Sequence, residues 1–370
     1  MGKHVAIVAS LASSLINFRR PLIVRLLAHG HRVTALAPKC ERTANELRSI
    51  GVELIQIRLR RTSLNPLADI ILMFELIRVF WRIAPDCVLS YTAKPVFYGT
   101  IAARIAGVPI IAAMITGLGY TFIEGSGAVR SILGVISRFL YRLSLKFANI
   151  VFFQNPDDRQ LFLNLGIVDH GKTRIVNGSG IDTNSYPLVA PPSSISFLMI
   201  SRILADKGVR EYVNASKVIR ARHPNIPCLL VGWIDSNPAA ISLREVSEWT
   251  KSGAIEYLGA VEDVRPLLAQ CAVYVLPSYR EGTPRTVLEA MSTGRAVITT
   301  DAPGCRETVL HGITGLLVAA RSVESLVSAM EQCIVAEVDW RAMGSAGRRF
   351  VESKYDAQKV SDMVMSALKL

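Results

Sequence analysis

Two glutamates eight residues apart are the side chains best suited to chemistry in this 370-residue chain. Glu281 and Glu289 lie in the segment Ser278-Tyr-Arg-Glu-Gly-Thr-Pro-Arg-Thr-Val-Leu-Glu-Ala-Met291, where Pro284 is typical of a helix start. This places Glu281 on a loop and Glu289 about a turn into a helix. Carboxylates there can accept hydrogen bonds from sugar hydroxyls, and the first N–H groups of a helix can bind phosphate. Because Pro284 has no N–H, the donors would be its neighbours: Thr283, Arg285 and Thr286. The alternative is a surface loop whose acidic residues suit the helix dipole.

Two cations form a second candidate site. Arg202 and Lys207 lie in Ser201-Arg-Ile-Leu-Ala-Asp-Lys-Gly208, directly after an apolar run. If that run is a strand, both side chains start from its carboxyl end and can converge on one anion. Arginine suits bidentate contact with phosphate, and lysine supplies a mobile charge. Two cations five residues apart are also common in a solvated loop, which is the alternative.

The elements that would position these residues are short apolar runs alternating with helical segments. The runs are bounded by Gly, Pro, Asn or Asp, as is typical of buried parallel strands. In the first half we predict strands at Val5–Ala9, Arg32–Ala37, Glu53–Ile57, Cys87–Ser90, Ile110–Ile115 and Ile150–Gln154. In the second half we predict strands at Phe197–Ser201, Cys228–Val231, Ile255–Leu258, Val273–Pro277 and Ala296–Thr300. The pattern predicts two doubly wound, Rossmann-like α/β domains.

A loop-rich segment separates the two series. It runs from Asn177-Gly-Ser-Gly-Ile-Asp182 to Pro187 and continues as Val189-Ala-Pro-Pro-Ser-Ser194. We predict domains at 1–180 and 181–347, with the remainder, 348–370, as a terminal helix. Open α/β sheets bind ligands at the carboxyl ends of their strands, so two such sheets would face across a ligand-binding cleft.

Charge is unevenly distributed along the chain. Residues 1–187 hold 22 Lys+Arg and 11 Asp+Glu, a net of +11, out of a formal net charge of +12 for the whole chain. The first domain should therefore meet an anionic partner, and composition alone leaves nucleic acid and an anionic membrane both open.

The segment Gly127–Phe147 predicts a basic amphipathic helix. One broad face carries six apolar side chains: Ile132, Leu133, Ile136, Phe139, Leu140 and Leu143. Arg138, Arg142 and Lys146 follow at spacings of four along one flank, and a second basic cluster comprises Arg58, Arg60 and Arg61. Such a helix suits an anionic lipid surface, although a core helix with a charged edge has the same pattern.

The six cysteines are scattered, without a CxxC pair. This excludes a disulfide framework and a zinc site, and indicates buried thiols in a reducing compartment. The start of the chain has the charge and apolar run of a weak signal peptide, but three serines interrupt the run, so a strand at Val5–Ala9 is preferred. No segment is long and apolar enough to span a membrane.

In this order, the two candidate sites resemble the family 4 glycosyltransferases, retaining enzymes of GT-B fold. The resemblance covers essentially the full chain, and in this family the last helix crosses back to the first domain. It implies that Arg202 and Lys207 bind the donor diphosphate, that Glu289 accepts from ribose hydroxyls and that Glu281 faces the donor sugar. The remaining implied donor-site residues are Gly259, Ala260, Gly282, Thr283, Arg285 and Thr286.

Further motifs resemble one group within that family, which extends sugars on undecaprenyl diphosphate in protein N-glycosylation and in capsule and O-antigen assembly. They are Ser63-Leu-Asn-Pro66, Thr116-Gly-Leu-Gly119, Leu143-Ser-Leu-Lys-Phe-Ala148, Gly259-Ala260 and Asp301-Ala-Pro-Gly-Cys305. The resemblance implies a UDP-sugar donor, plausibly UDP-GalNAc, and a polyprenyl-diphosphate-linked sugar acceptor. The enzyme would then work at the inner face of the cell membrane, docked through the two basic clusters.

One departure from the family concerns the first domain. Many members carry a histidine beneath the donor sugar, whereas this chain has Met114-Ile-Thr-Gly-Leu-Gly-Tyr120. Thr116, Gly117 and Lys94 are the candidates for sugar or acceptor contacts there.

The resemblance also implies a mechanism. The departing phosphate takes the acceptor proton on the same face, without a protein nucleophile. Cations at the diphosphate replace a metal, and no Asp-x-Asp follows a first-domain strand, so we expect no essential metal and no cofactor.

Two rival functions remain open. A sugar-nucleotide 2-epimerase shares the fold but has no need of a basic first domain. A nucleic-acid-binding protein would use that basic half, but no known nucleic-acid-binding motif is present.

Overall fold

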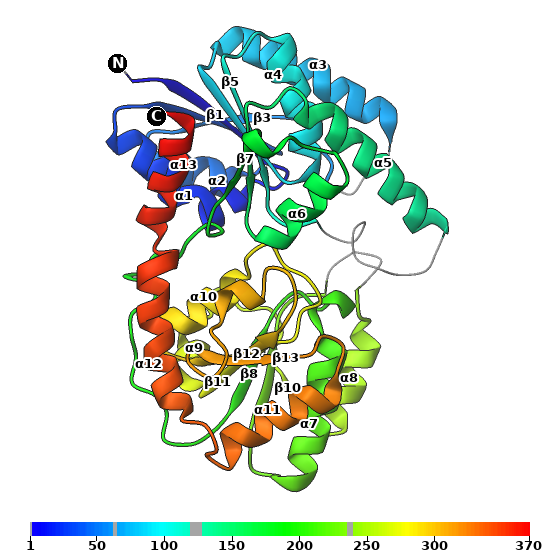
Figure 1. The fold of residues 1–370 in the computed structure, drawn as a ribbon, viewed down its shortest axis with the longest axis vertical. Coiled ribbons are helices and arrows are strands. Elements are labelled where there is room, and N and C mark those ends of the chain that lie inside the picture. The colour runs from blue at the N-terminus through cyan, green and yellow to red at the C-terminus, as the bar shows by residue number, and fades with distance from the viewer. Residues whose placement is uncertain (1, 62–64, 119–127, 235–239) are drawn as a thin grey trace. The chain divides into compact units, whose positions relative to one another are not determined.

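In a computed structural model, which describes residues 2–61, 65–118, 128–234 and 240–370, the chain forms two compact units (Figure 1). Unit 1 comprises Met1–Gly180 with Ala357–Leu370, and unit 2 comprises Ile181–Asp356. Each unit is a parallel sheet with helices on both faces.

Unit 1 contains a seven-stranded parallel sheet in the order β3-β2-β1-β4-β5-β6-β7. Its strands are β1 His4–Val8, β2 Arg32–Ala37, β3 Glu53–Gln56, β4 Cys87–Tyr91, β5 Ile110–Ile115, β6 Ile150–Phe153 and β7 Thr173–Ile175. The strand order reverses between β1 and β4. Ligands of open α/β sheets bind at the carboxyl edge beside such a reversal.

The helices of unit 1 cover both faces of this sheet. One layer contains α1 Ser13–Ala28, α2 Glu41–Arg48 and α13 Ala357–Leu368, and shares a core with β1, β2 and β4. The other layer contains α3 Pro66–Ile83, the π-helical turn η1 Pro95–Gly99, α4 Thr100–Ile105, α5 Ala128–Leu145 and α6 Pro156–Asn164. The start of α3 follows directly from its sequence. Asn65 caps the helix by accepting from the N–H groups of Leu67 and Ala68, and Pro66 occupies the first turn.

Unit 2 contains a six-stranded parallel sheet in the order β10-β9-β8-β11-β12-β13. Its strands are β8 Phe197–Ile200, β9 Cys228–Val231, β10 Glu256–Tyr257, β11 Val273–Leu276, β12 Ala296–Thr300 and β13 Gly315–Val318. Its helices are α7 Val209–Arg222, α8 Leu243–Lys251, α9 Arg265–Gln270, α10 Arg285–Ser292, α11 Val323–Ile334 and α12 Trp340–Phe350, with the short turns η4 Ala205–Lys207 and η6 Val351–Tyr355. The order reverses between β8 and β11, and the segments carrying Lys207 and Glu281 follow these two strands.

The prediction of two doubly wound sheets is confirmed, and the eleven predicted strands all form. Two edge strands, β7 and β13, were not predicted, because they are only three and four residues long. The single terminal helix predicted over Arg348–Leu370 is wrong. The segment consists of the end of α12, then η6 and α13, with Asp356 between the last two. α13 packs on α1, and Arg25 binds Asp362 at 2.7 Å.

Candidate donor site

Two glycines bring the loops at the carboxyl edge of the unit 2 sheet together. Gly208 has φ +72°, and a Cβ there would lie 2.1 Å from the carbonyl oxygen of Pro277, at the end of β11. Gly232 has φ +151°, and a Cβ there would lie 1.7 Å from the carbonyl oxygen of Ser201. Only glycine fits such approaches without displacing the backbone. The loops after β8, β9 and β11 are therefore in direct contact.

Lys207 and Glu281 form an ion pair at this edge. Lys207 Nζ lies 2.5 Å from Glu281 Oε1, and the two side chains are 14% and 15% exposed. Ser278 Oγ donates to the same carboxylate oxygen at 2.7 Å. The pair is therefore largely shielded, which strengthens an electrostatic interaction relative to a surface pair. The cation of one predicted segment and the carboxylate of the other thus meet in one place.

The loop that carries Glu281 rests on the segment after β12. Glu281 N donates to the carbonyl of Pro303 at 2.9 Å, and the hydroxyl of Thr300 donates to the carbonyl of Ser278. Gly304 has φ +82°, and a Cβ there would lie 2.1 Å from the carbonyl oxygen of Glu281. This explains the glycine in the Asp301–Cys305 motif: it lets the two loops touch.

Glu289 lies one turn into α10 and is 7% exposed. Its Oε1 accepts from Arg285 Nε and from the hydroxyl of Tyr186, both at 2.9 Å. Its Oε2 accepts no hydrogen bond from the residues that the structure describes. Burial raises the pKa of Glu289 above its ordinary value, and Arg285 opposes that shift through its charge and its hydrogen bond. The arrangement is a positioned carboxylate with one oxygen left for a ligand.

Tyr186 is a site residue that the sequence analysis missed. It lies in the linker 103 positions before Glu289. Its carbonyl is held by Ser292 Oγ at 2.7 Å and by Arg348 Nη1 at 2.8 Å. No motif surrounds it, so only the tertiary structure reveals that it supports Glu289.

The remaining predicted donor-site residues lie on the same edge. Arg202 is half-buried and lies two positions after the end of β8. Gly259 accepts from Gly232 N at 2.9 Å, which joins the loops after β9 and β10, and Ala260 beside it is exposed. Gly282 and Thr283 lie on the loop before α10. The hydroxyl of Thr286 lies 2.6 Å from that of Tyr274, and so orients the first turn of the helix.

The predicted residues of unit 1 lie at the carboxyl edge of its own sheet. Thr116 and Gly117 directly follow β5, and Lys94 follows β4 and precedes η1. Lys94 Nζ binds Asp69 Oδ1 of α3 at 2.6 Å, and Tyr98 donates to Asp69 Oδ2 at 2.9 Å. Lys94 is thus already paired with a carboxylate. Gly119 of the same predicted loop lies outside the described residues.

A second missed feature marks the strand reversal in unit 1. Thr92, just after β4, has φ +68°, a conformation unfavourable for a β-branched residue. Its hydroxyl donates to Ser10 Oγ, just after β1, at 2.8 Å. The rule that ligands bind at a strand reversal could have identified both residues from the predicted strands.

The predicted basic residues are exposed, but they are not equivalent. Arg58, Arg60 and Arg61 follow β3, Arg138 lies on the surface of α5, and Lys146 follows the end of that helix. Arg142 donates to the carbonyls of Leu165 and Gly166 at 2.6 and 3.2 Å, and so secures the end of α6. The apolar face predicted for α5 is largely exposed, because Ile132, Ile136, Phe139 and Leu143 lie at the surface; the helix packs into the core through Tyr141 and Leu145 instead.

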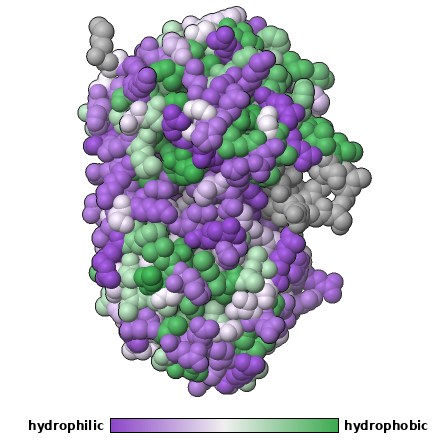
Figure 2. All heavy atoms as spheres, viewed as in Figure 1, coloured by the Kyte–Doolittle hydropathy of each residue, from purple (hydrophilic) through white to green (hydrophobic). Residues whose placement is uncertain are grey.

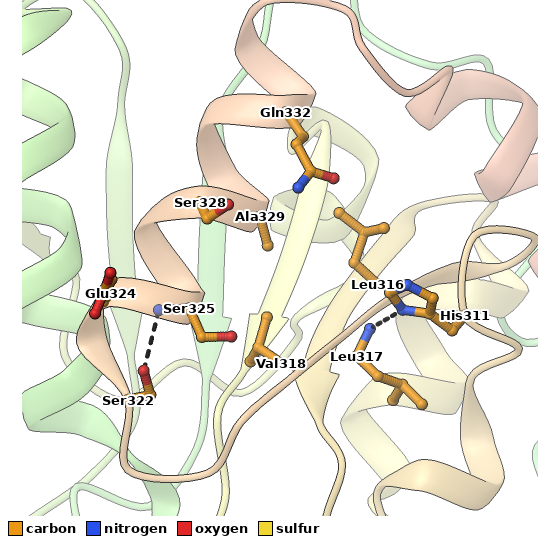
Figure 3. A pocket seen from close by; sticks show the side chains of 10 residues that line it. All are labelled: His311, Leu316, Leu317, Val318, Ser322, Glu324, Ser325, Ser328, Ala329 and Gln332. Carbon is orange, nitrogen blue, oxygen red and sulfur yellow. Dashed lines mark hydrogen bonds between the residues drawn. The ribbon is translucent and has the colours of Figure 1, made fainter.

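A cavity of about 350 Å³ lies away from this site, between β13 and α11 (Figure 3). Its wall includes His311, whose Nδ1 accepts from Leu317 N at 3.0 Å, and the small side chains of Ser325, Ser328 and Ala329. It contains none of the predicted site residues, so it is not the candidate donor site.

Comparison with known proteins matches both units to known families. Residues 194–335 match the model of the group 1 glycosyl transferases, and residues 18–178 match the glycosyl transferase 4-like domain. The chain is 30% identical over 337 residues, 87% of each chain, to the N,N′-diacetylbacillosaminyl-diphospho-undecaprenol alpha-1,3-N-acetylgalactosaminyltransferase of Campylobacter jejuni. It is 24% identical to the capsular polysaccharide biosynthesis glycosyltransferase CapM of Staphylococcus aureus, over 85% of this chain and 84% of that protein.

The fold is also that of solved structures. The Anabaena protein Alr3699/HepE, solved in complex with UDP and glucose, superposes with a TM-score of 0.77 at 18% identity, covering 99% of both chains. This likeness shows the GT-B fold.

Proposed function

The chain belongs to the family 4 (group 1) glycosyltransferases, which are retaining enzymes, and on that basis we propose that it transfers a sugar from a UDP-sugar to a polyprenyl-diphosphate-linked sugar. The donor sugar we propose is GalNAc. The support is that the 30% identical Campylobacter jejuni relative is an N-acetylgalactosaminyltransferase. The product would contribute to a surface polysaccharide or a glycoprotein glycan, and the reaction would take place at the inner face of the cell membrane.

The observation that carries this proposal is the pairing of Lys207 with Glu281 beside a buried Glu289 whose Oε2 is available. A nucleotide sugar needs all three kinds of group: a cation for its diphosphate, a carboxylate at its sugar and a carboxylate for its ribose hydroxyls. In the proposed complex, Arg202, Lys207 and the first N–H groups of α10 contact the diphosphate. The diphosphate competes with Glu281 for Lys207, and in the proposed complex Glu281 faces the sugar.

In the proposed reaction, these donors stabilise the negative charge that develops on the leaving UDP. The bond from the anomeric carbon to the diphosphate oxygen breaks as the sugar gains oxocarbenium character. The acceptor hydroxyl attacks from the same face and passes its proton to the departing phosphate oxygen. The configuration at the anomeric carbon is therefore retained, no protein nucleophile is needed and the positive charge comes from side chains rather than from a metal.

The test is a panel of UDP- and GDP-sugars offered with a short-chain polyprenyl-diphosphate sugar, with the product identified by mass. We expect one added hexosamine from UDP-GalNAc. Transfer from another donor would correct the sugar but retain the class. Turnover of UDP-GlcNAc to UDP-ManNAc without acceptor, and without transfer from any donor, would replace the proposal with an epimerase.

A further inference from the structure

Two helices of unit 1 each have a row of apolar side chains that no other described residue covers. On α3 the exposed apolar side chains repeat every three or four positions in the first half of the helix and recur near its end: Leu67, Ile70, Ile71, Phe74 and Trp81. On α5 they follow the same spacing: Ile132, Val135, Ile136, Phe139 and Leu143. This spacing places each set on one side of its helix. Phe139 is 62% exposed and Trp81 is 61% exposed, so these are not the edges of buried residues.

These exposed faces do not result from poorly packed helices, because each helix is anchored by its opposite side. α3 buries Leu72, Leu76 and Phe80 against the sheet. α5 buries Leu145 and Tyr141, whose ring packs edge-on against Phe97 of η1 at 4.6 Å. Both helices contact η1, so they belong to the same layer on one face of the sheet (Figure 1). Figure 2 shows apolar side chains gathered where Figure 1 places α5. Soluble proteins rarely leave apolar surface of this extent without a partner.

The charges around these faces are positive. α5 has no acidic residue and presents Arg138, and Lys146 follows its end. α3 adds the exposed Arg78 and Arg82. The two carboxylates of α3 are already engaged: Asp69 binds Lys94 and Tyr98, and Glu75 accepts from Arg58 N at 2.9 Å. An apolar face flanked by cations and by a tryptophan is complementary to an anionic bilayer surface. A second copy of this chain would instead bring like charges together.

We propose that α3 and α5 form one membrane-insertion surface, whose apolar faces enter the interfacial region of an anionic phospholipid bilayer. None of the helices in the described residues is long and apolar enough to cross a membrane, and the helices would lie in the plane of the interface. This surface rests on the proposed function only for its purpose, which is to hold the enzyme where a lipid-linked acceptor is found. It goes beyond docking by charge alone, because buried apolar area makes binding persist when salt screens the cations.

Trp81 provides a direct test. Of the four tryptophans, Trp249 and Trp340 are buried, and Trp233 is the other exposed one. In a Trp233→Phe background, Trp81 fluorescence should shift to the blue on vesicles of phosphatidylcholine with about 30 mol % phosphatidylglycerol, and brominated lipid tails should quench it. Binding without quenching would place α3 outside the bilayer and overturn the proposal. No acceptor or donor is present, so this result is independent of sugar transfer.

Substitution on the proposed surface provides a second test. Phe74→Ser with Phe139→Ser should lower the vesicle partition coefficient by about tenfold or more, at low salt and at about 1 M salt, where the Debye length is about 3 Å. The matched control is Leu243→Ser on α8 of unit 2, which removes a side chain of 65% exposure and should change nothing. Thermal unfolding of each variant checks that it is folded.

Three results would overturn the proposal. Wild-type binding that vanishes at high salt would reduce the contact to charge alone. Unchanged partitioning of the double variant would exclude α3 and α5. A dimer in light scattering that the double variant dissociates would assign the surface to a second copy of the chain.

Discussion

Removing the carboxylate of Glu289 should weaken donor use more than any other single change in α10. Its Oε2 accepts no hydrogen bond from the described residues, while Arg285 and Tyr186 hold Oε1. A hydrogen bond to a charged group contributes about 1.5–3 kcal/mol, and one to a neutral group about 0.5–1.5 kcal/mol. Glu289→Ala should therefore lower kcat/KM for the donor by about 10- to 150-fold, and Glu289→Gln, which keeps a neutral acceptor, by about tenfold.

The assay compares the natural donor with donors that lack the 2′- or the 3′-hydroxyl of the ribose. Wild-type enzyme should discriminate against at least one of these analogues, and the Gln variant should lose most of that discrimination. The comparison isolates the contact from any general loss of activity, because both donors meet the same protein. Glu248→Gln on α8 is the matched control. It breaks another Arg–Glu pair four residues apart, which is 61% exposed at the glutamate, and should leave kinetics unchanged.

Stability has to be measured beside activity. Glu289→Ala removes the ion pair with Arg285, whose side chains are 26% exposed at the arginine and 9% at the glutamate, so it should also lower the free energy of unfolding by about 1–3 kcal/mol. A folded Gln variant that keeps wild-type discrimination between the natural and deoxy donors would refute the assignment of Glu289 to the ribose.

Three further predictions follow from the same geometry. Because the pKa of Glu289 is raised in the folded protein, lowering the pH from neutral should stabilise wild type relative to Glu289→Gln, which urea unfolding measures. For the same reason, the acid limb of the pH–rate profile for donor kcat/KM should lie at a higher pH than the pKa of an ordinary glutamate. Activity should survive EDTA, whereas Lys207→Gln should lower kcat/KM for the donor by about 10- to 150-fold. An enzyme that EDTA inactivates and manganese restores would contradict the assignment of the diphosphate charge to side chains. At Gly304, φ is +82° and a Cβ would lie 2.1 Å from the Glu281 carbonyl oxygen, so Gly304→Ala should lower the free energy of unfolding by about 2–4 kcal/mol. Gly312 has a similar φ of +76° but open space around it, so the control Gly312→Ala should lower it by only about 1 kcal/mol. Equal melting temperatures for the two variants would show that the loops do not need their close approach.

The elements that could be predicted from the sequence are those whose burial leaves a local pattern. Strands such as β2 and β5 form over the predicted residues, because a short apolar run bounded by turn residues is typical of a buried parallel strand. β13 begins at Gly315, where a Cβ would lie 2.1 Å from the carbonyl of Val297. A glycine that allows close approach to a neighbouring backbone weakens the apolar pattern from which a strand is predicted. β7 has only three residues, two of them exposed, so its apolar signal is too weak to detect.

The donor site likewise contains residues that could be predicted from the sequence and residues that only the structure reveals. Lys207 and Glu281 could be proposed because each follows a predicted strand, and strands on the two sides of a reversal deliver their loops to one edge. Their 2.5 Å pairing depends on Gly208 and Gly304, whose role is a contact with distant backbone and has no local signature. Tyr186 could not be predicted from the sequence. It supports Glu289 only because Ser292 and Arg348 donate hydrogen bonds to its carbonyl and so hold this linker residue beside α10.

α5 shows why an amphipathic pattern does not reveal which face of a helix is buried. The pattern Ile132, Ile136, Phe139 and Leu143 is the one that core helices use, and it alone would place those side chains inside. The structure buries the other side, because Tyr141 packs between Phe97 and Phe162, with centroid distances of 4.6 and 5.0 Å, and Leu145 joins the same core. Once aromatic packing has fixed that side, the aliphatic face must point outward. A helix that is apolar on both sides and has no acidic residue needs a second apolar environment. Within the described part of unit 1, α3 is likewise apolar on two sides, and its two carboxylates, Asp69 and Glu75, are engaged by neighbouring groups of the protein. For this reason we assign the two helices to one bilayer-facing surface.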